Sequence, residues 1–516
     1  MLHWVGHKIL GQIRHLSLGV LVLGVSLSFV CLYGADAVAQ QGTTLRVAIG
    51  GLPTYRGNPF RTAQTPTITV ISAIFDSLTH LRSDGTVAPW LATTWRAVDD
   101  FTWEFKLRDD VNFANGAPFN ANTVVFFVNY IAGPGPATQD LRRELSILAG
   151  ARAIDEQTVQ ITTKKPVPLL PRYASIMLMP EPAAWGSLGL EGFAEQPVGT
   201  GPFVLDRWEP SGAYMYANNR SWRPPMVDRV EVLGIRDGTA RIQALQSDRI
   251  DIAVGIASDD FGLVAQSGGR VATYREGAVN GIFLRTDRNN PLSDRRVRRA
   301  LNLAVDRQTI VDVLLGGRTE LSGQPAVATA YGYNSAIKPY PHDPEAARAL
   351  MLEAGYPDGF TFVVETSAGD PNLALVLQRV AADLKSIGVN MEIQSRPLMV
   401  FLGDFVRGSL TRDAFTLVWG ATPTLDAVRA IALHSCQKPA PWYCDKRITP
   451  TIEAAVTEWD NERAIALRQQ IMKFYHDEAP SIFLYESVGF SGLHKRVRGF
   501  RYTYGKINYH EISLKN

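Results

Sequence analysis

Strand and helix patterns alternate in two separate parts of this chain, one before about residue 255 and one after about residue 285. Alternating or β-branched runs predict strands at 44–49, 101–107, 158–162, 250–254, 360–366 and 389–394. Apolar positions at helical spacing predict helices at 68–78, 123–131, 237–246, 344–354, 373–387 and 462–476. Because each part can form an open sheet covered by helices, the sequence predicts two α/β lobes with a crevice between them.

The segment 290–317 predicts a pair of short helices docked on a core. Ser293 or Asp294 is suited to cap the first helix. The apolar face of that helix contains Val297, Leu301 and Ala304. A second helix is expected to begin at Asp306 and to end at Gly316.

The amino terminus predicts a secretory signal peptide over residues 1–39. Basic and titratable residues precede an almost wholly apolar run at 16–33, and Ala37-Val38-Ala39 offers a small-x-small cleavage site. The alternatives are an uncleaved membrane anchor, since the apolar run is about long enough to span a bilayer, and a lipid-modified Cys31, whose preceding residues fit such a site poorly. We therefore expect a mature protein in the periplasm.

Charge and motifs exclude several classes of function. The formal net charge of the 516-residue chain is only +2, so it has no field suited to nucleic acid, and no nucleic-acid partner is expected. A secreted hydrolase is the alternative, but no serine lies in a G-x-S-x-G motif, and neither a P-loop nor an H-E-x-x-H motif is present. We predict no catalytic residue, no enzyme activity and no cofactor.

Two cysteines remain after the signal peptide, Cys436 and Cys444. A lone pair of cysteines in an exported chain predicts a disulfide. The alternative is a metal site that includes His434, but thiolate ligands need a reducing compartment. The other histidines of the mature chain are scattered without i, i+4 pairs, so no metal site is predicted.

Several blocks in the same order resemble a known family. The run PLSDRRVRRALNLAVDR at 291–307 and the turn PVGTGPF at 197–203 look like signatures of the bacterial family 5 solute-binding proteins, the extracytoplasmic receptors of peptide, nickel and opine ABC importers. The other matching blocks are 74–78, 89–95, 102–121, 343–347 and the Cys436–Cys444 loop.

The resemblance implies a fold like that of type II periplasmic binding proteins, with an extra subdomain inserted in lobe I. We expect lobe I at 40–76, 196–280 and 485–516, the subdomain at 77–195 and lobe II at 281–484. The implied function is capture of a peptide or peptide-like small solute and its delivery to an ABC permease, by a monomer. A periplasmic sensor or chaperone with the same fold is the alternative.

The residues that grip peptide ends in such relatives are replaced in this chain. In peptide-binding members, an Asp three residues after a Trp holds the ligand's amino group. Trp419 corresponds to that Trp, and the residue three positions after it is Thr422 rather than Asp. Thr366, Ser367 and Ala368 stand where dipeptide-binding members carry an Arg for the carboxylate. Asp426 is nearby, but its neighbours predict a helix-cap role.

Other candidate ligand residues come from loops and from the expected crossover. Trp419 and Thr422 are candidate ligand residues. Tyr55 and Asn58 are two further candidates, because they lie in a Gly/Pro-rich loop after the first strand. Asn280 lies at the expected crossover, and Tyr443 lies in the disulfide loop. We leave the ligand open among peptides, opines, sugars, glutathione-like compounds and metal chelates.

Overall fold

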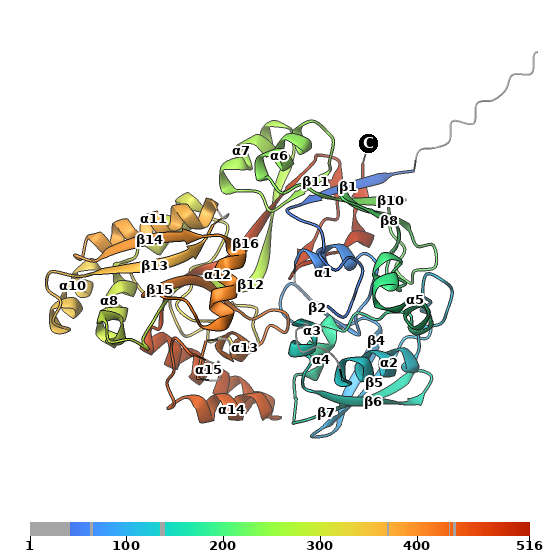
Figure 1. Ribbon diagram of the computed structural model, residues 1–516, viewed down its shortest axis with the longest axis horizontal. Coiled ribbons are helices and arrows are strands. Elements are labelled where there is room, and N and C mark those ends of the chain that lie inside the picture. The colour runs from blue at the N-terminus through green and yellow to red at the C-terminus, as the bar shows by residue number, and fades with distance from the viewer. Residues whose placement is uncertain are drawn as a thin grey trace, which may run out of the picture. The chain divides into compact units, whose positions relative to one another are not determined.

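One ten-stranded sheet runs through both lobes of the protein. The computed structural model describes residues 42–61, 65–134, 140–368, 371–432, 434–436 and 440–515. The strand order is β14-β13-β15-β12-β16-β11-β1-β10-β9-β8. Figure 1 shows β12 and β16 passing between the strands of the two lobes. The signal-peptide prediction lies outside the described residues.

The strands divide into three groups by position in this order. Lobe I contains β1 (Thr44–Ile49), β8 (Phe203–Glu209), β9 (Gly212–Ala217), β10 (Arg229–Gly234) and β11 (Ile252–Val254). Lobe II contains β13 (Thr361–Ser367), β14 (Asn390–Arg396) and β15 (Ala414–Gly420). The long crossover strands are β12 (Arg270–Leu284) and β16 (Ser481–Leu493).

Helices cover both faces of the lobe II strands. One core contains side chains of α8 (Arg295–Ala304), α10 (Pro344–Glu353) and α11 (Pro371–Lys385). The opposite core contains side chains of α12 (Leu398–Arg407), α13 (Ala427–Ala432), α14 (Thr449–Thr457) and α15 (Asn461–Glu478). Lobe I carries α1 (Thr67–Ile71), α6 (Gly238–Gln246) and α7 (Phe261–Gln266).

A second sheet forms the inserted subdomain. Its order is β4-β5-β7-β6, with β4 (Ala92–Asp99), β5 (Thr102–Leu107), β6 (Leu148–Asp155) and β7 (Thr158–Thr163). The subdomain also holds α2 (Ala121–Ala132), α3 (Asp140–Glu144), α4 (Leu170–Tyr173) and α5 (Pro182–Glu195). Short hairpins pair β2 (Thr79–Leu81) with β3 (Val87–Pro89), and β18 (Tyr502–Thr503) with β19 (Lys506–Ile507).

Most predicted elements are confirmed, and β1 has the predicted bounds. The helix predicted at 68–78 is wrong beyond its first turn and a half, because α1 ends at Ile71. The carbonyl groups of Ala73 and Ile74 instead accept hydrogen bonds from Phe203 N at 3.0 Å and Gly201 N at 2.8 Å. The chain turns there because the 197–203 segment supplies its backbone partners.

Side-chain caps fix several helix starts. Asp294 accepts from Arg296 N and caps α8, as one of the two predicted alternatives. Asp237 caps α6, and Asp343 caps α10 with Pro344 in the first turn. In α14, Ile448 holds the N-cap position without a side-chain hydrogen bond, and a proline lies in the first turn.

Buried polar side chains of the 290–317 segment hold the start of β16. Arg298 donates to Glu478 O at 2.7 Å and 3.0 Å. Asn302 donates to Ser481 O at 2.9 Å and accepts from Phe483 N at 3.2 Å. Arg307, which belongs to α9 (Arg307–Thr309), donates to Phe483 O and to Asn302 O and Oδ1. The 290–317 segment therefore fixes where β16 enters the sheet.

We predict that Arg307→Met destabilises the protein by about 3 kcal/mol or more. Burial lowers the pKa of Arg307 to about 10, so it stays cationic at neutral pH while it holds several buried acceptors. Methionine fills similar space but leaves those acceptors without a donor. Urea denaturation measures the loss, with the exposed Arg299 substituted by Met as control; equal stability of the two variants contradicts this role.

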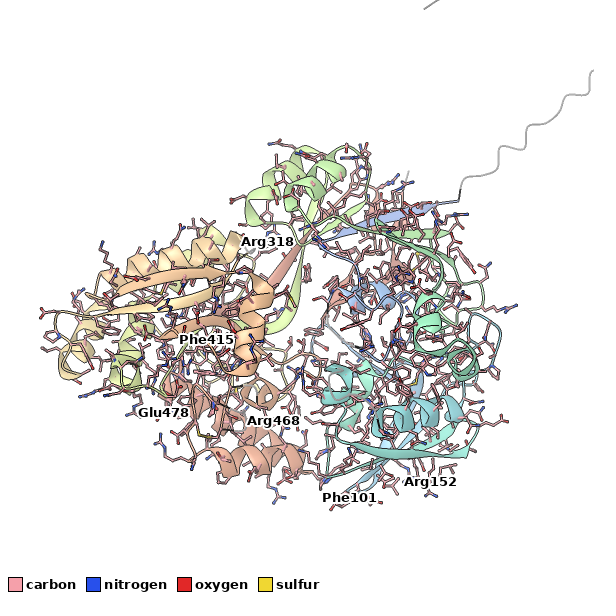
Figure 2. All side chains as sticks on the ribbon, viewed as in Figure 1. Phe101, Arg152, Arg318, Phe415, Arg468 and Glu478 are labelled. Carbon is pink, nitrogen blue, oxygen red and sulfur yellow. A yellow bond between two sulfur atoms is a disulfide. The ribbon has the colours of Figure 1, made fainter. Side chains whose placement is uncertain are left out.

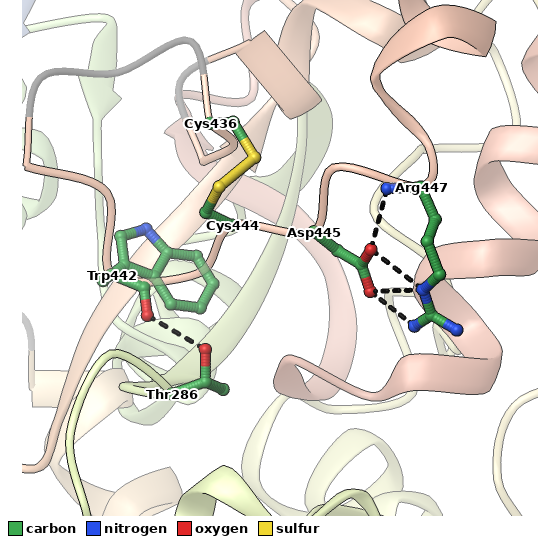
Figure 3. The surroundings of a disulfide bond; sticks show 6 residues. All are labelled: Thr286, Cys436, Trp442, Cys444, Asp445 and Arg447. Atoms are coloured by element: carbon green, nitrogen blue, oxygen red, sulfur yellow. Dashed lines mark hydrogen bonds and ion pairs between the residues drawn. A yellow bond between two sulfur atoms is a disulfide. The ribbon is translucent and has the colours of Figure 1, made fainter.

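The predicted disulfide is confirmed between Cys436 and Cys444. Figure 3 shows that the chain beside it is held to the end of β12, because Trp442 O accepts hydrogen bonds from Thr286 N at 3.0 Å and Thr286 Oγ1 at 3.3 Å. Asp445 pairs with Arg447 on the other side (Figure 3). Trp442 and Tyr443, beside the cross-link, belong to the lobe II core.

Candidate functional site

Trp419 lies at the end of β15 within an aromatic cluster. Its side chain is fully buried, and its ring stacks on Phe283 at 4.8 Å and meets Tyr475 edge-on at 5.7 Å. Phe415, labelled within lobe II in Figure 2, extends the cluster 5.3 Å from Phe283. The Trp419 Nε1 atom has no hydrogen-bond acceptor among the described residues. A ligand role for Trp419 stays a prediction, and its packing role is evident.

We predict that Trp419→Ala lowers the free energy of unfolding by about 3–5 kcal/mol, because it empties a large buried volume. Trp419→Phe keeps most of the ring contacts and is expected to cost less than Trp419→Ala. Chemical denaturation of both variants checks this order. A Trp419→Ala variant with wild-type stability would contradict the packing role and favour a side chain that lines the ligand site.

Thr422 follows β15 in a loop that packs on the crossover strand. A Cβ atom built on Gly277 would lie 2.6 Å from Thr422 Cγ2 and 2.9 Å from Leu425 Cδ2. Gly277 also has φ +73°, which favours glycine. It lies where the β12–β16 register shifts between Arg275 and Val279. The loop at 421–425 is therefore in direct contact with the irregular part of β12.

Tyr55 and Asn58 line a pocket of about 230 Å³ between their loop and α5. Tyr55 is 46% exposed, and the Arg61 guanidinium lies 4.7 Å from its ring centroid. Asn58 is buried, and its Oδ1 accepts from Phe60 N at 2.9 Å. Arg56 pairs with Glu195 at the pocket rim. Asn58 thus stabilises its own turn, and ligand roles for both predicted residues remain predictions.

Asn280 lies on the crossover strand β12, whereas Tyr443 lies in the lobe II core. Asn280 Nδ2 donates to Ser487 Oγ at 2.7 Å and so links β12 to β16. Tyr443 is buried beside Tyr475, and burial raises the pKa of its hydroxyl well above the usual range. Its hydroxyl has no hydrogen-bond partner within the described ranges. The predicted site residues are therefore dispersed over lobe I, the crossovers and the lobe II core.

Other side chains join the subdomain to lobe II. Arg429 of α13 and Glu144 of α3 form an ion pair at 2.6 Å, and both are largely buried. Trp103 of β5 stacks on Trp459, which precedes α15, with ring centroids 5.6 Å apart. The paired residues are 285 positions apart in the ion pair and 356 positions apart in the tryptophan stack, and together these contacts hold the two parts against each other.

Lobe I also reaches lobe II close to the crossover strands. Tyr504, between β18 and β19, donates its hydroxyl to Thr329 Oγ1 at 3.0 Å. On the other side, Ser258 Oγ donates to Asn372 Oδ1 of α11 at 3.1 Å. The lobes are therefore joined by direct contacts at two separate places.

A cationic group of residues lies beside the β18–β19 hairpin. Desolvation lowers the pKa of Lys506 to about 8, and its ammonium group donates to Ser175 O at 2.7 Å. Burial and the nearby Lys506 and Arg223 charges lower the pKa of His80 to about 3. Asp76 supplies a buried counter-charge and pairs with Arg223 at 2.6 Å. His80 is therefore neutral at physiological pH.

The sequence did not reveal the residues that join the lobes. Glu144, Arg429 and Trp459 lie in unremarkable local patterns, and only the packing of distant segments brings them to their partners. Asp426 was predicted as a cap and does accept from Val428 N at 3.2 Å. It also forms a buried ion pair with Arg468 at 2.8 Å, which no local pattern indicates.

The comparisons identify the family. The model for bacterial extracellular solute-binding proteins, family 5 Middle, matches residues 86–434. This chain belongs to that family. The glutathione-binding protein GsiB of Salmonella typhimurium is 26% identical, over 95% of this chain and 96% of the relative. The di/tripeptide-binding protein 2 of Pseudomonas aeruginosa is 26% identical, over 81% of this chain and 84% of the relative.

The fold agrees with solved structures of such proteins. HbpA2 from Haemophilus parasuis superposes with a TM-score of 0.78 at 23% identity, over 92% of this chain and 100% of that one. The solute-binding protein therefore has the predicted fold of two α/β lobes with an inserted subdomain. Members of the family are binding proteins. Within the described ranges, no helix has the length and hydropathy to cross a membrane, and no cluster of three metal-ligating side chains occurs.

Proposed function

We propose that this protein is the extracytoplasmic substrate-binding component of an ABC importer and captures a peptide or peptide-like small solute between its lobes. The observation that carries the proposal is the pair of long strands, β12 and β16, on either side of which the lobes make direct contacts. A solute enclosed by such contacts shifts the protein toward its closed state, which a membrane permease then distinguishes from the open one.

The ligand class rests on the relatives and on the replaced anchors. The two relatives described above are named for glutathione and for di- and tripeptides. Thr422 replaces the acidic residue expected for a free amino group, and Thr366 is engaged with Thr416 through a 2.7 Å hydrogen bond. Since an unpaired buried charge costs several kcal/mol, a ligand with an ordinary α-ammonium group is disfavoured relative to a blocked or atypical peptide.

The remaining assignments belong to the same proposal. We place lobe I at residues 40–76, 196–280 and 485–516, the subdomain at 77–195 and lobe II at 281–484. We propose export to the periplasm by cleavage after Ala39, action as a monomer, and a role in binding rather than catalysis. Trp419, Thr422, Tyr55, Asn58, Asn280 and Tyr443 remain the proposed ligand residues.

Small-angle scattering and thermal unfolding test the proposal on the mature protein after ligand is removed by unfolding and refolding. The probes are reduced glutathione, N-acetyl-Ala-Ala and N-acetyl-Ala-Ala-Ala, with maltose and free alanine as controls. We expect a peptide probe at about 100 times its Kd to stabilise the protein by about 2.7 kcal/mol and to reduce the radius of gyration. A response to maltose alone would contradict a peptide-like ligand.

A further inference from the structure

Arg172 of α4 reaches from the subdomain to lobe II. Its Nη1 atom donates to Gly85 O at 3.0 Å and to Thr424 O at 3.2 Å. Its guanidinium carbon lies 5.2 Å from the ring centroid of Tyr331. Thr424 and Tyr331 both belong to lobe II, so Arg172 lies where the subdomain and lobe II meet. Within the described residues, its Nε and Nη2 atoms make no hydrogen bond.

The charges around Arg172 do not balance. A second guanidinium, that of Arg468, lies 4.8 Å from the same Tyr331 ring. Arg468 is paired with the buried Asp426, at 2.8 Å and 3.2 Å. Among the described residues, no carboxylate forms an ion pair with Arg172. The Arg172 and Arg468 guanidinium groups therefore both lie beside the Tyr331 ring, but the Asp426 carboxylate pairs only with Arg468. Arg468 is labelled in Figure 2.

The polar groups near Arg172 do not provide it with a carboxylate partner. Thr424 is fully buried, and its hydroxyl has no partner within the described ranges. Glu144, the acidic residue that bridges to lobe II, is already paired with Arg429. Desolvation lowers the pKa of Arg172, although the nearby Asp426 charge raises it. A guanidinium in such surroundings has donors in a fork suited to a carboxylate.

We propose that Arg172 binds a carboxylate of the captured solute and replaces, from the subdomain, the lobe II anchor that this chain lacks. The solute is then a peptide-like anion in which one carboxylate is not balanced by a protein-bound ammonium group. Because Arg172 also contacts Thr424 O, carboxylate binding is coupled to contact between the lobes. This inference rests on the proposed function and specifies the ligand chemistry of that same site.

Isothermal titration calorimetry with paired probes tests the assignment. N-acetyl-Ala-Ala-Ala and reduced glutathione are compared with their carboxyl-terminal amides on the wild type, Arg172→Gln and Arg172→Lys. We expect the wild type to bind an acid about tenfold or more tightly than its amide. Arg172→Gln is expected to bring the two forms within about threefold by weakening the acid alone, and Arg172→Lys to give an intermediate ratio.

Arg288→Gln is the matched control. Arg288 is also half-buried and donates to two backbone carbonyl groups, Thr411 O and Leu410 O, which both lie in lobe II. It is expected to keep the wild-type ratio, and thermal unfolding checks that each variant folds. If the wild type binds the peptide probes and Arg172→Gln leaves the ratio of acid to amide affinity unchanged, the role of Arg172 is overturned but the proposed function is not. A wild type that binds no peptide probe overturns both.

Discussion

The buried hydrogen bonds at the start of β16 are the interaction on which the rest of the structure depends. Arg298, Asn302 and Arg307 supply donors to backbone carbonyl groups at residues 478–483, where the last helix of lobe II turns into the strand. Because β16 pairs with β12 along its length and also with β11, its position sets the register of both lobes. The fixed start of β16 thus positions the strands of the ten-stranded sheet.

The middle of the β12–β16 pair is irregular, as the proposed closure of the lobes requires. The register between β12 and β16 shifts between Arg275 and Val279, where Gly277 lies, and again between Val279 and Gly281, while the pairs on either side are regular. Irregular pairing in the middle leaves two rigid ends with a short segment able to absorb rotation. The 421–425 loop packs on Gly277, so the proposed ligand residue Thr422 lies against this irregular segment.

Contacts between the lobes then determine what closure encloses. Arg429 and Glu144 neutralise each other, as do Arg468 and Asp426, and both pairs lie where the subdomain meets lobe II. Arg172 is the cation left over there. In the proposed carboxylate site, charge complementarity comes from this subdomain residue rather than from Thr422 and Thr366 of lobe II.

Local patterns in the sequence predicted the fold well and the site poorly. Strands such as β1 and caps such as Asp294 depend on neighbours within a few residues, and the disulfide depended only on cysteine count and compartment. The helix expected at 68–78 failed because residues 201–203 pair with its carbonyl groups. Arg172 and Thr424 are 252 positions apart, so no local pattern indicates their contact.

Identification of the solute that accompanies the protein tests the central claim most directly. The mature protein is purified from its own periplasm, weighed intact by native mass spectrometry, and then denatured so that any bound compound is released and identified. We predict a peptide-like compound with a free carboxylate at near-stoichiometric occupancy. A released sugar, a cationic compound or a metal chelate without a peptide portion would contradict the account.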